Sequence, residues 1–190
     1  MAIFAGKIDE SITTDEMMMK KFLLTLVIMV VAMAARAQEG QQATLKKVYD
    51  EQINPLEQID QAVASAASQG KYVICQVGGN WCPWCLRFAD FISSDSTISK
   101  VIDDNFVYIH VNYNPRARGD EARVKLAEQT LQRLGNPARF GFPVFVVLDG
   151  EGRVIHIQDS VFLEEGKGYN KERTLRFFQN WTPAAVNTTN

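Results

Sequence analysis

Apolar and polar positions alternate with two different periods between residues 55 and 181. Short runs rich in β-branched residues predict buried strands, because a strand covered on both faces is apolar at nearly every position. Apolar residues spaced three and four apart predict amphipathic helices between these runs. The strands are expected at 72–77, 106–111, 143–148 and 153–157, and the helices at 56–69, 83–91, 97–104, 120–134 and 170–181.

A helical extension is expected ahead of the first strand, with one interruption. Residues 41–53 carry a short apolar stripe at helical spacing, formed by Leu45, Val48 and Tyr49. Asn54-Pro55 breaks this pattern, because the residue before a proline avoids the helical conformation. The next helix then begins directly after the break.

The order of these elements defines the fold class. Ser96 is expected to cap the helix at 97–104. The glycine-containing turn at 149–152 is expected to join the last two strands into an antiparallel hairpin. Strands that alternate with helices predict an α/β fold in which helices cover both faces of a mixed sheet. The sequence shows no internal repeat and no second domain, so residues 38–190 are expected to form a single domain.

Composition excludes several classes of protein. The 190 residues are 46% hydrophobic and 22% charged, which is ordinary for a globular protein and argues against disorder. The formal net charge is −2, and the basic residues are scattered along the chain. Nucleic-acid binding is therefore not expected, since it requires a concentrated basic surface.

Residues 1–37 form a separate part of the sequence. A basic pair at 20–21 precedes an apolar run at 22–33, which ends in Ala-Ala-Arg-Ala at 34–37. These are the three parts of a secretory signal peptide, whereas a membrane-spanning anchor needs about 20 apolar residues. We therefore expect an upstream segment, a signal peptide at 19–37 and cleavage after its last alanine. The mature protein is expected to be exported, periplasmic and without a stable membrane anchor.

The chemistry of the sequence is concentrated in Cys82 and Cys85. A spacing of two residues lets such a pair close a disulfide in the first turn of a helix. At the helix N-terminus, free amide groups and the helix dipole would stabilise the Cys82 thiolate, which is the reactive form. Cys82 is therefore the predicted nucleophile. Cys85, one turn further along, is the predicted resolving thiol.

A Cys-x-x-Cys motif can also be a structural disulfide or half of a zinc site. Zinc would need a second pair of ligands, and the sequence offers only Cys75, His110 and His156, without a paired spacing. The motif follows a buried strand and opens a helix, which favours a redox pair. Cys75 is expected to be inert core, the histidines structural, and neither a metal nor an organic cofactor is expected.

Two motifs together resemble the thioredoxin superfamily. Trp-Cys-Pro-Trp-Cys at 81–85 follows a buried strand, and Gly-Phe-Pro-Val-Phe stands further along at 141–145. The resemblance spans roughly residues 71–157 and implies a thioredoxin-like sheet and dithiol–disulfide exchange. It also implies a cis peptide before Pro143, opposite the cysteine pair, that binds the substrate chain. Trp81 matches the tryptophan that commonly precedes the first cysteine in this family.

Apolar residues adjoin the motifs. Trp84 stands between the two cysteines, and together with Phe142 it is expected to form an apolar rim against which a substrate chain docks; packing in the core is the alternative role of both residues. The expected partners are protein thiols and disulfides, together with a redox protein that recycles the pair. The Pro83-Trp84 dipeptide between the cysteines differs from the Gly-Pro of reducing thioredoxins, and the direction of electron flow stays open.

One position departs from the family pattern. Gln76 stands where thioredoxins commonly keep a buried acid that assists proton transfer from the second thiol. An amide neither takes up nor releases a proton in the working pH range. The alternative function is a binding module on the same fold, such as a copper or maturation chaperone, because copper(I) prefers thiolate ligands.

Overall fold

The computed structural model describes residues 17–27, 29, 45–114 and 120–188. Residues 17–27 are helical. The chain divides into two compact units, and the second, Leu45–Asn190, contains the whole sheet. No membrane-spanning helix is found in the part of the chain that the structure describes. The expected cleavage point after Ala37 lies outside the described residues.

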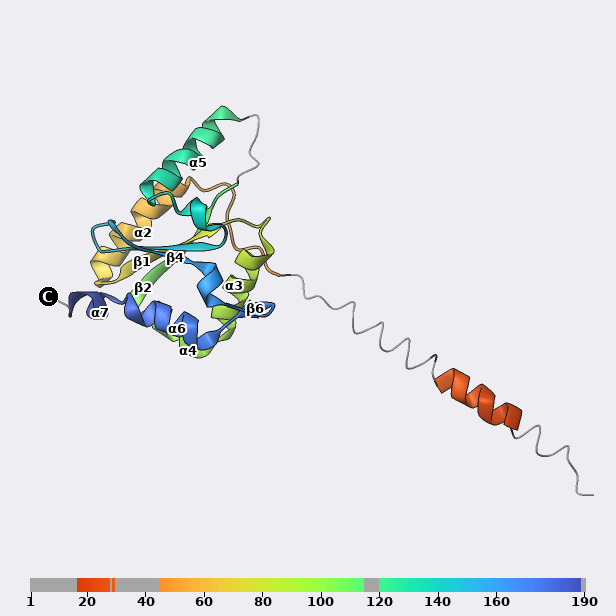
Figure 1. The fold of residues 1–190 in the computed structure, drawn as a ribbon. Coiled ribbons are helices and arrows are strands. Elements are labelled where there is room, and N and C mark those ends of the chain that lie inside the picture. Colours follow the sequence, from red (N-terminus) through yellow and green to blue (C-terminus); the bar gives the residue numbers. More distant parts are fainter. Residues whose placement is uncertain (1–16, 28, 30–44, 115–119, 189–190) are drawn as a thin grey trace, which may run out of the picture. The chain divides into compact units, whose positions relative to one another are not determined.

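The second unit is built on a mixed sheet of four strands (Figure 1). Its order is β2-β1-β3-β4, in which β1 pairs parallel with β2 and antiparallel with β3, and β3 pairs antiparallel with β4. A second sheet contains only the short strands β5 and β6. The strands are β1 (Tyr72–Gly78), β2 (Phe106–Asn112), β3 (Val144–Leu148), β4 (Val154–Asp159), β5 (Glu164–Glu165) and β6 (Gly168–Tyr169).

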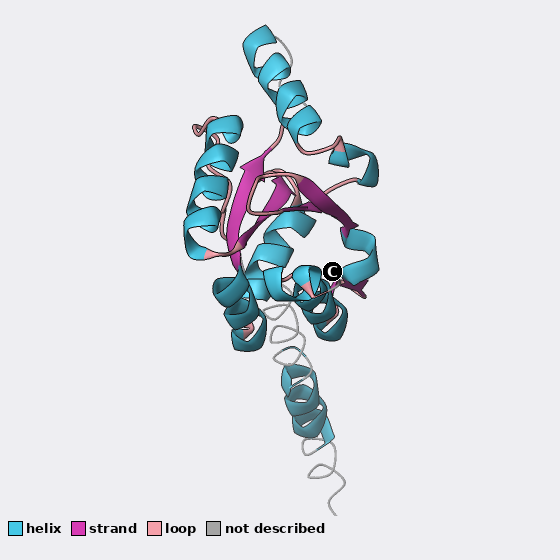
Figure 2. Ribbon diagram, turned by 90° about the vertical axis from the view of Figure 1, so that its left-hand side faces the viewer, coloured by secondary structure: helices cyan, strands magenta, loops and turns pink. Residues whose placement is uncertain are grey.

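Helices cover both faces of the main sheet, and Figure 2 shows the sheet between them. The helices are α2 (Pro55–Gln69), α3 (Pro83–Ser94), α4 (Ser96–Asn105), α5 (Glu121–Arg133), α6 (Lys171–Asn180) and α7 (Pro183–Asn187), with 3-10 turns at Pro137–Phe140 and Ser160–Leu163. One core joins α3, α4 and α6 to the sheet, and the other joins α2 and the end of α5 to its opposite face. The predicted α/β class with a doubly covered mixed sheet is confirmed.

Alternation along β1 divides its side chains between the two cores. Ile74 packs with α3, α4 and α6, whereas Val73, Cys75 and Val77 pack with α2 and α5. All of these side chains are fully buried. This is the arrangement that a nearly uniform apolar strand predicts, because successive residues point to opposite faces. The same strand leads directly into the cysteine motif.

The predicted start of a helix directly after Asn54 is confirmed, and Asn54 is its N-cap residue. Its side-chain oxygen accepts a hydrogen bond from the Leu56 amide at 3.0 Å, and α2 starts at Pro55. Gly70 ends the helix with a φ of 64°, in the left-handed region that favours glycine. These local signals set the two ends of α2.

Two predictions about helices are wrong. Residues 45–53 contain no helix, because their backbone is bound by a side chain from another part of the molecule, described below. Helix α4 is capped by Asp95 and not by Ser96, which is already its first residue. The Asp95 carboxylate accepts hydrogen bonds from the amides of Thr97 and Ile98 at 2.9 and 3.1 Å.

Candidate active site

The cysteine pair lies at the N-terminus of α3. Cys82 is the N-cap residue and Pro83 is the first helical residue, where its missing N–H is not needed. Cys82 and Cys85 form a disulfide with a Cα–Cα distance of 5.3 Å. The Cys85 amide donates a hydrogen bond to Cys82 Sγ at 3.2 Å. The first sulfur is therefore held against the positive end of the helix, the position that stabilises a thiolate.

Burial distinguishes the two cysteines. Cys82 is 5% exposed and Cys85 is completely buried. Cys82 Sγ also lies 3.6 Å from the carbonyl oxygen of Phe142. The outer sulfur thus lies beside the second motif, while the inner cysteine is closed off from solvent.

The second motif meets the first directly. The Phe142–Pro143 peptide is cis, and β3 begins at the next residue, Val144. The fold places β3 beside β1, so the peptide before β3 comes to rest next to the helix that follows β1. The resemblance implied this arrangement of Cys82 and Pro143.

Three aromatic side chains form a rim on one side of the cysteines. Trp81 is 38% exposed, and its ring meets Phe142 edge-on with 5.5 Å between ring centroids. Phe142 stacks on Tyr113 at 5.1 Å. The indole N–H of Trp81 donates to the Tyr113 carbonyl at 2.8 Å, which fixes the orientation of the exposed ring. Tyr113 carries no motif signal and was missed by the sequence reasoning.

Trp84 lies between the cysteines in sequence and packs, like Phe142, against the cluster that contains both of them. Its ring meets Tyr169 edge-on at 5.6 Å, and the Arg87 guanidinium lies 5.1 Å from its ring centre. The side chain is half-buried. Arg87 is thus placed over an aromatic face, in the geometry of a cation–π contact.

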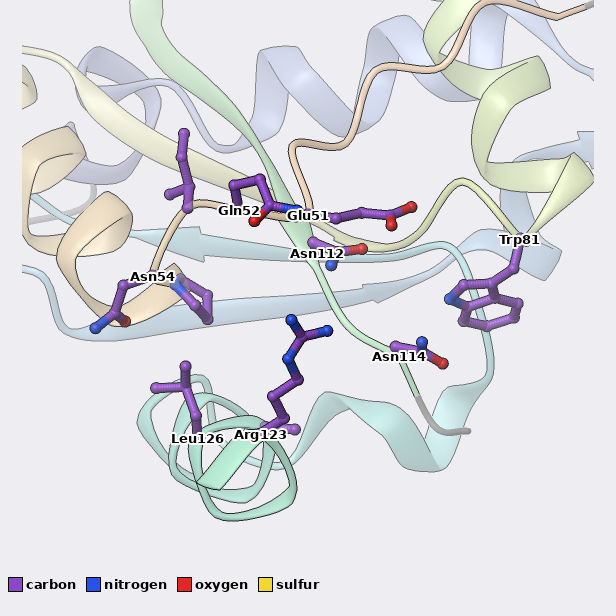
Figure 3. A pocket seen from close by; sticks show the side chains of 11 residues that line it. Glu51, Gln52, Asn54, Trp81, Asn112, Asn114, Arg123 and Leu126 are labelled. Carbon is purple, nitrogen blue, oxygen red and sulfur yellow. The ribbon is translucent and has the colours of Figure 1, made fainter. Parts of the chain in front are cut away.

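A cavity of about 260 Å³ lies beside the exposed ring of Trp81. Its lining includes the amide side chains of Gln52, Asn54 and Asn112. Figure 3 shows the Arg123 guanidinium pointing into it. No local sequence pattern predicts this cavity, because its walls come from segments that are far apart along the chain.

A buried hydrogen-bond network lies beneath the inner cysteine. Gln76 is fully buried, and its amide nitrogen donates to Tyr49 Oη at 2.7 Å and to the Cys85 carbonyl at 2.9 Å. Its amide oxygen accepts from Tyr108 Oη at 2.6 Å. The residue that replaces the family's acid is therefore a fully bonded link between the helix and two tyrosines.

Tyr49 reaches this network from the segment that precedes α2. The Asn80 side-chain oxygen accepts hydrogen bonds from the amides of Val48 and Tyr49 at 3.2 and 3.1 Å. The Asn80 side-chain nitrogen donates to the Tyr49 carbonyl at 2.8 Å and to Glu51 Oε1 at 3.1 Å. These contacts replace the helical hydrogen bonds that the sequence pattern predicted. Neither Tyr49 nor Asn80 was recognised as a site residue from the sequence.

The two glycines before the motif are required by close packing. A Cβ on Gly78 would clash with Cys85 Sγ and would lie 2.9 Å from Tyr49 Oη. A Cβ on Gly79 would clash with the Trp81 indole. Close packing therefore accounts for glycine at both positions.

Two other titratable groups near the site are neutral because they are buried. Burial raises the pKa of Cys75 to about 12, although Arg133 lowers it slightly. Burial lowers the pKa of His110 to about 4, and its Nε2 atom is buried without a hydrogen-bond partner. The His110 ring meets the rings of Tyr49 and Tyr108 edge-on at 5.3 and 5.4 Å.

Metal ligands do not gather at the pair. Within residues 17–27, 29, 45–114 and 120–188, no group of three or more His, Cys, Asp or Glu side chains could hold a metal ion. The copper-binding alternative therefore rests on the two thiols of Cys82 and Cys85 alone.

Comparison with known proteins identifies the family. A family model described as thioredoxin-like matches residues 54–150, just over half of the chain, and the chain belongs to this family. No curated protein matches the sequence. The fold together with the cysteine pair supports thiol–disulfide oxidoreductase chemistry in general.

Solved structures with the same fold are similar in architecture and distant in sequence. A disulphide isomerase from Xylella fastidiosa Temecula1 is 22% identical, with a TM-score of 0.58 over 72% of this chain and 98% of that chain. A thioredoxin from Thermus thermophilus is 18% identical, with a TM-score of 0.45 over 72% and 87% of the two chains. At this level of identity the first similarity establishes the thioredoxin-like fold.

Proposed function

We propose that this protein exchanges the Cys82–Cys85 disulfide or dithiol with protein substrates and is returned to its working state by a redox partner. The observation that carries the proposal is the position of Cys82. Its sulfur accepts the Cys85 amide at the start of α3 and lies beside the Phe142–Pro143 peptide. These contacts support Cys82 as the nucleophile and the Phe142–Pro143 peptide as part of the surface that binds a substrate chain.

The proposed exchange transfers two electrons between the cysteine pair and a substrate disulfide without a cofactor. In the reductive direction, the Cys82 thiolate attacks a substrate disulfide, forms a mixed disulfide and releases one substrate thiolate. Cys85 then attacks Cys82 Sγ, forms the internal disulfide and releases the second substrate sulfur. The pair supplies two electrons, and its protons end on the two substrate thiols. The oxidative direction is the same sequence in reverse.

The surroundings of Cys82 support contact with a protein chain. Phe142 and Pro143 flank the sulfur, and Trp81 presents an exposed ring at the same rim. Trp84 is half-buried and packs against the cluster that contains both cysteines. The amide-lined cavity next to Trp81 adds hydrogen-bonding groups that an extended backbone can use. In this assignment Trp81, Trp84, Phe142 and Pro143 bind the substrate.

Replacement of each cysteine by serine tests the proposal. With a disulfide-bonded protein substrate and a chemical reductant, Cys82→Ser is expected to lose all turnover above the uncatalysed background. Cys85→Ser is expected to accumulate a mixed disulfide through Cys82, visible on a non-reducing gel, because the resolving thiol is absent. Cys75→Ser serves as the matched control and is expected to keep turnover. Turnover by Cys82→Ser at the wild-type rate would refute the assignment.

We infer that residues 19–37 direct export of the protein. The support is the basic pair, the short apolar run and the small-x-small end in the sequence. Expression of the full chain in a bacterium, followed by fractionation and N-terminal sequencing, tests this inference. A periplasmic product that starts at Gln38 is expected, and an uncleaved cytoplasmic product would contradict it.

A further inference from the structure

Cys85, the proposed resolving thiol, is buried, and Gln76 stands nearby where thioredoxins commonly keep an acid. Cys85 is completely buried, and its sulfur must become a thiolate before it attacks the mixed disulfide. Gln76 uses both amide hydrogens, on Tyr49 and on the Cys85 carbonyl, and accepts the Tyr108 hydroxyl. It has no hydrogen left for the sulfur. Another group is needed to stabilise the charge.

Tyr49 is the polar side chain that lies next to this sulfur. It is 4% exposed and packs in one cluster with Cys82, Cys85 and Leu86. A Cβ placed on Gly78 would lie 2.9 Å from Tyr49 Oη and even closer to Cys85 Sγ. The hydroxyl oxygen and the inner sulfur therefore flank the same small space above Gly78.

The direction of the hydrogen bonds leaves the Tyr49 proton available. Tyr49 Oη accepts a hydrogen bond from Gln76 Nε2, so its own O–H points elsewhere. Among the described residues, no hydrogen bond donated by this hydroxyl is found in the disulfide form. Burial raises the pKa of Tyr49 above its ordinary value, so the group stays protonated and acts as a donor. A thiolate formed at Cys85 would be a charged acceptor beside it.

We propose that Tyr49 is a positioning residue for the resolving step, in which its hydroxyl donates a hydrogen bond to the Cys85 thiolate. The inference rests on the proposed function. Cys85 loses its proton, the Cys85–Cys82 bond forms, the bond from Cys82 to the substrate breaks, and the released substrate sulfur gains a proton. The Tyr49 proton stays on Tyr49. A lone pair of the Cys85 thiolate forms the new S–S bond, and the electron pair of the broken S–S bond leaves with the substrate sulfur.

The other titratable groups around the sulfur offer no competing charge. Tyr108 is partly buried, and desolvation raises its pKa, so it remains neutral. His110 faces Tyr49 edge-on and is neutral above pH 4 to 5, since burial lowers its pKa to about 4. A hydrogen bond to a charged group is stronger than one to a neutral group. The Tyr49 donor is therefore expected to set the proton affinity of Cys85.

Tyr49→Phe removes this donor and keeps the ring. The mixed disulfide of Cys82 with a small aromatic thiol is formed, and release of that thiol is followed by stopped-flow absorbance between pH 6 and 10. We expect about tenfold slower release at neutral pH and a pH profile displaced upward by about one unit. Alkylation of Cys82 in the fully reduced protein is expected to keep its wild-type rate. Tyr72→Phe, also a buried tyrosine but at the far end of β1, is the matched control.

The outcomes separate this inference from the function on which it rests. Slower release with an upward-displaced profile in Tyr49→Phe alone supports it, because a general loosening of the fold would not move the pH profile of one step. Wild-type release by Tyr49→Phe overturns it and leaves the exchange activity intact. A wild-type protein that forms no mixed disulfide and never exchanges overturns the proposed function, and this inference with it.

Discussion

At the scale of single residues, the most unusual group near the site is His110. It is the residue in β2 whose ring contacts both tyrosines of the buried network, and its Nε2 has no hydrogen-bond partner. Burial lowers its pKa to about 4, from 6.5 in an unfolded chain. A buried histidine that must stay neutral makes the stability of the protein depend on pH.

We expect His110 to destabilise the fold as the pH falls. The folded pKa is lower than the unfolded one, so the unfolded chain binds the proton first, and stability is lost between about pH 6.5 and 4. The loss is expected to reach roughly 2–3 kcal/mol at pH 4. Urea unfolding of the wild type and of His110→Phe at pH 7, 6, 5 and 4 measures it as the difference between the two curves.

His156 provides the comparison for this experiment. Burial lowers its pKa as well, but a hydrogen bond with the Gln158 side chain opposes the shift. His156→Phe is therefore expected to remove a smaller part of the pH dependence than His110→Phe. An equal pH dependence in the wild type and in His110→Phe would show that His110 is not the group responsible.

At the scale of elements, the site depends on a segment without regular secondary structure. Residues 45–53 are held by the Asn80 side chain. It accepts hydrogen bonds from the backbone amides of Val48 and Tyr49 and donates one to the Tyr49 carbonyl. Asn80 itself lies in the turn between β1 and α3, two residues before Cys82. The same turn thus positions the nucleophile and the tyrosine that approaches the resolving thiol.

Asn80→Ala is expected to release this segment while the sheet stays folded. The amides of Val48 and Tyr49 lose their acceptor, and each hydrogen bond contributes about 1 kcal/mol. Hydrogen exchange at these two amides is expected to become at least fivefold faster, with unchanged exchange in β1. Asn105→Ala, which removes a single side-chain contact to the Val101 carbonyl within α4, is the control. If hydrogen exchange at the Tyr49 amide is unchanged in Asn80→Ala, side-chain packing holds the segment without the hydrogen bonds of Asn80.

At the scale of the whole molecule, local signals account for the scaffold. The apolar runs, the helix start after Asn54 and the helix end at Gly70 are local signals, each within a few residues of the element that it determines, and the structure confirms them. The cysteine motif is local in the same way, because Pro83 and the helix start lie inside it. Its general chemistry was therefore predictable from the sequence.

The rest of the site depends on contacts across the chain. Tyr49 meets Gln76, and Val48 meets Asn80, only because the segment before α2 folds back over the start of α3. The apolar stripe in this segment predicted a helix, but the amides of Val48 and Tyr49 donate to the Asn80 side chain and not to helical carbonyl groups. Tyr113 likewise joins the rim through β2. No local pattern encodes such pairings, so the sequence predicts the cysteines and misses what supports them.

The segment before residue 54 completes the site around the inner cysteine. The family model begins at residue 54, whereas the compact unit begins at Leu45. The residues between them bring Tyr49 against both cysteines and Leu86. Residues 45–53 therefore pack over the inner cysteine of the thioredoxin-like core. A shorter chain that begins at residue 54 would lack this segment.

We expect a chain of residues 54–190 to fold and to be less stable than one of residues 45–190. Removal of Tyr49 and its neighbours exposes the apolar surface around Cys85 and leaves a Gln76 hydrogen unpaired, which together cost roughly 2–5 kcal/mol. Urea unfolding of the reduced proteins measures this loss. Iodoacetamide is also expected to modify Cys85 in the shorter chain faster than in the longer one, while buried Cys75 stays unmodified in both. Equal stability and equal Cys85 reactivity in the two chains would show that the segment only lies on the surface of a site that is complete without it.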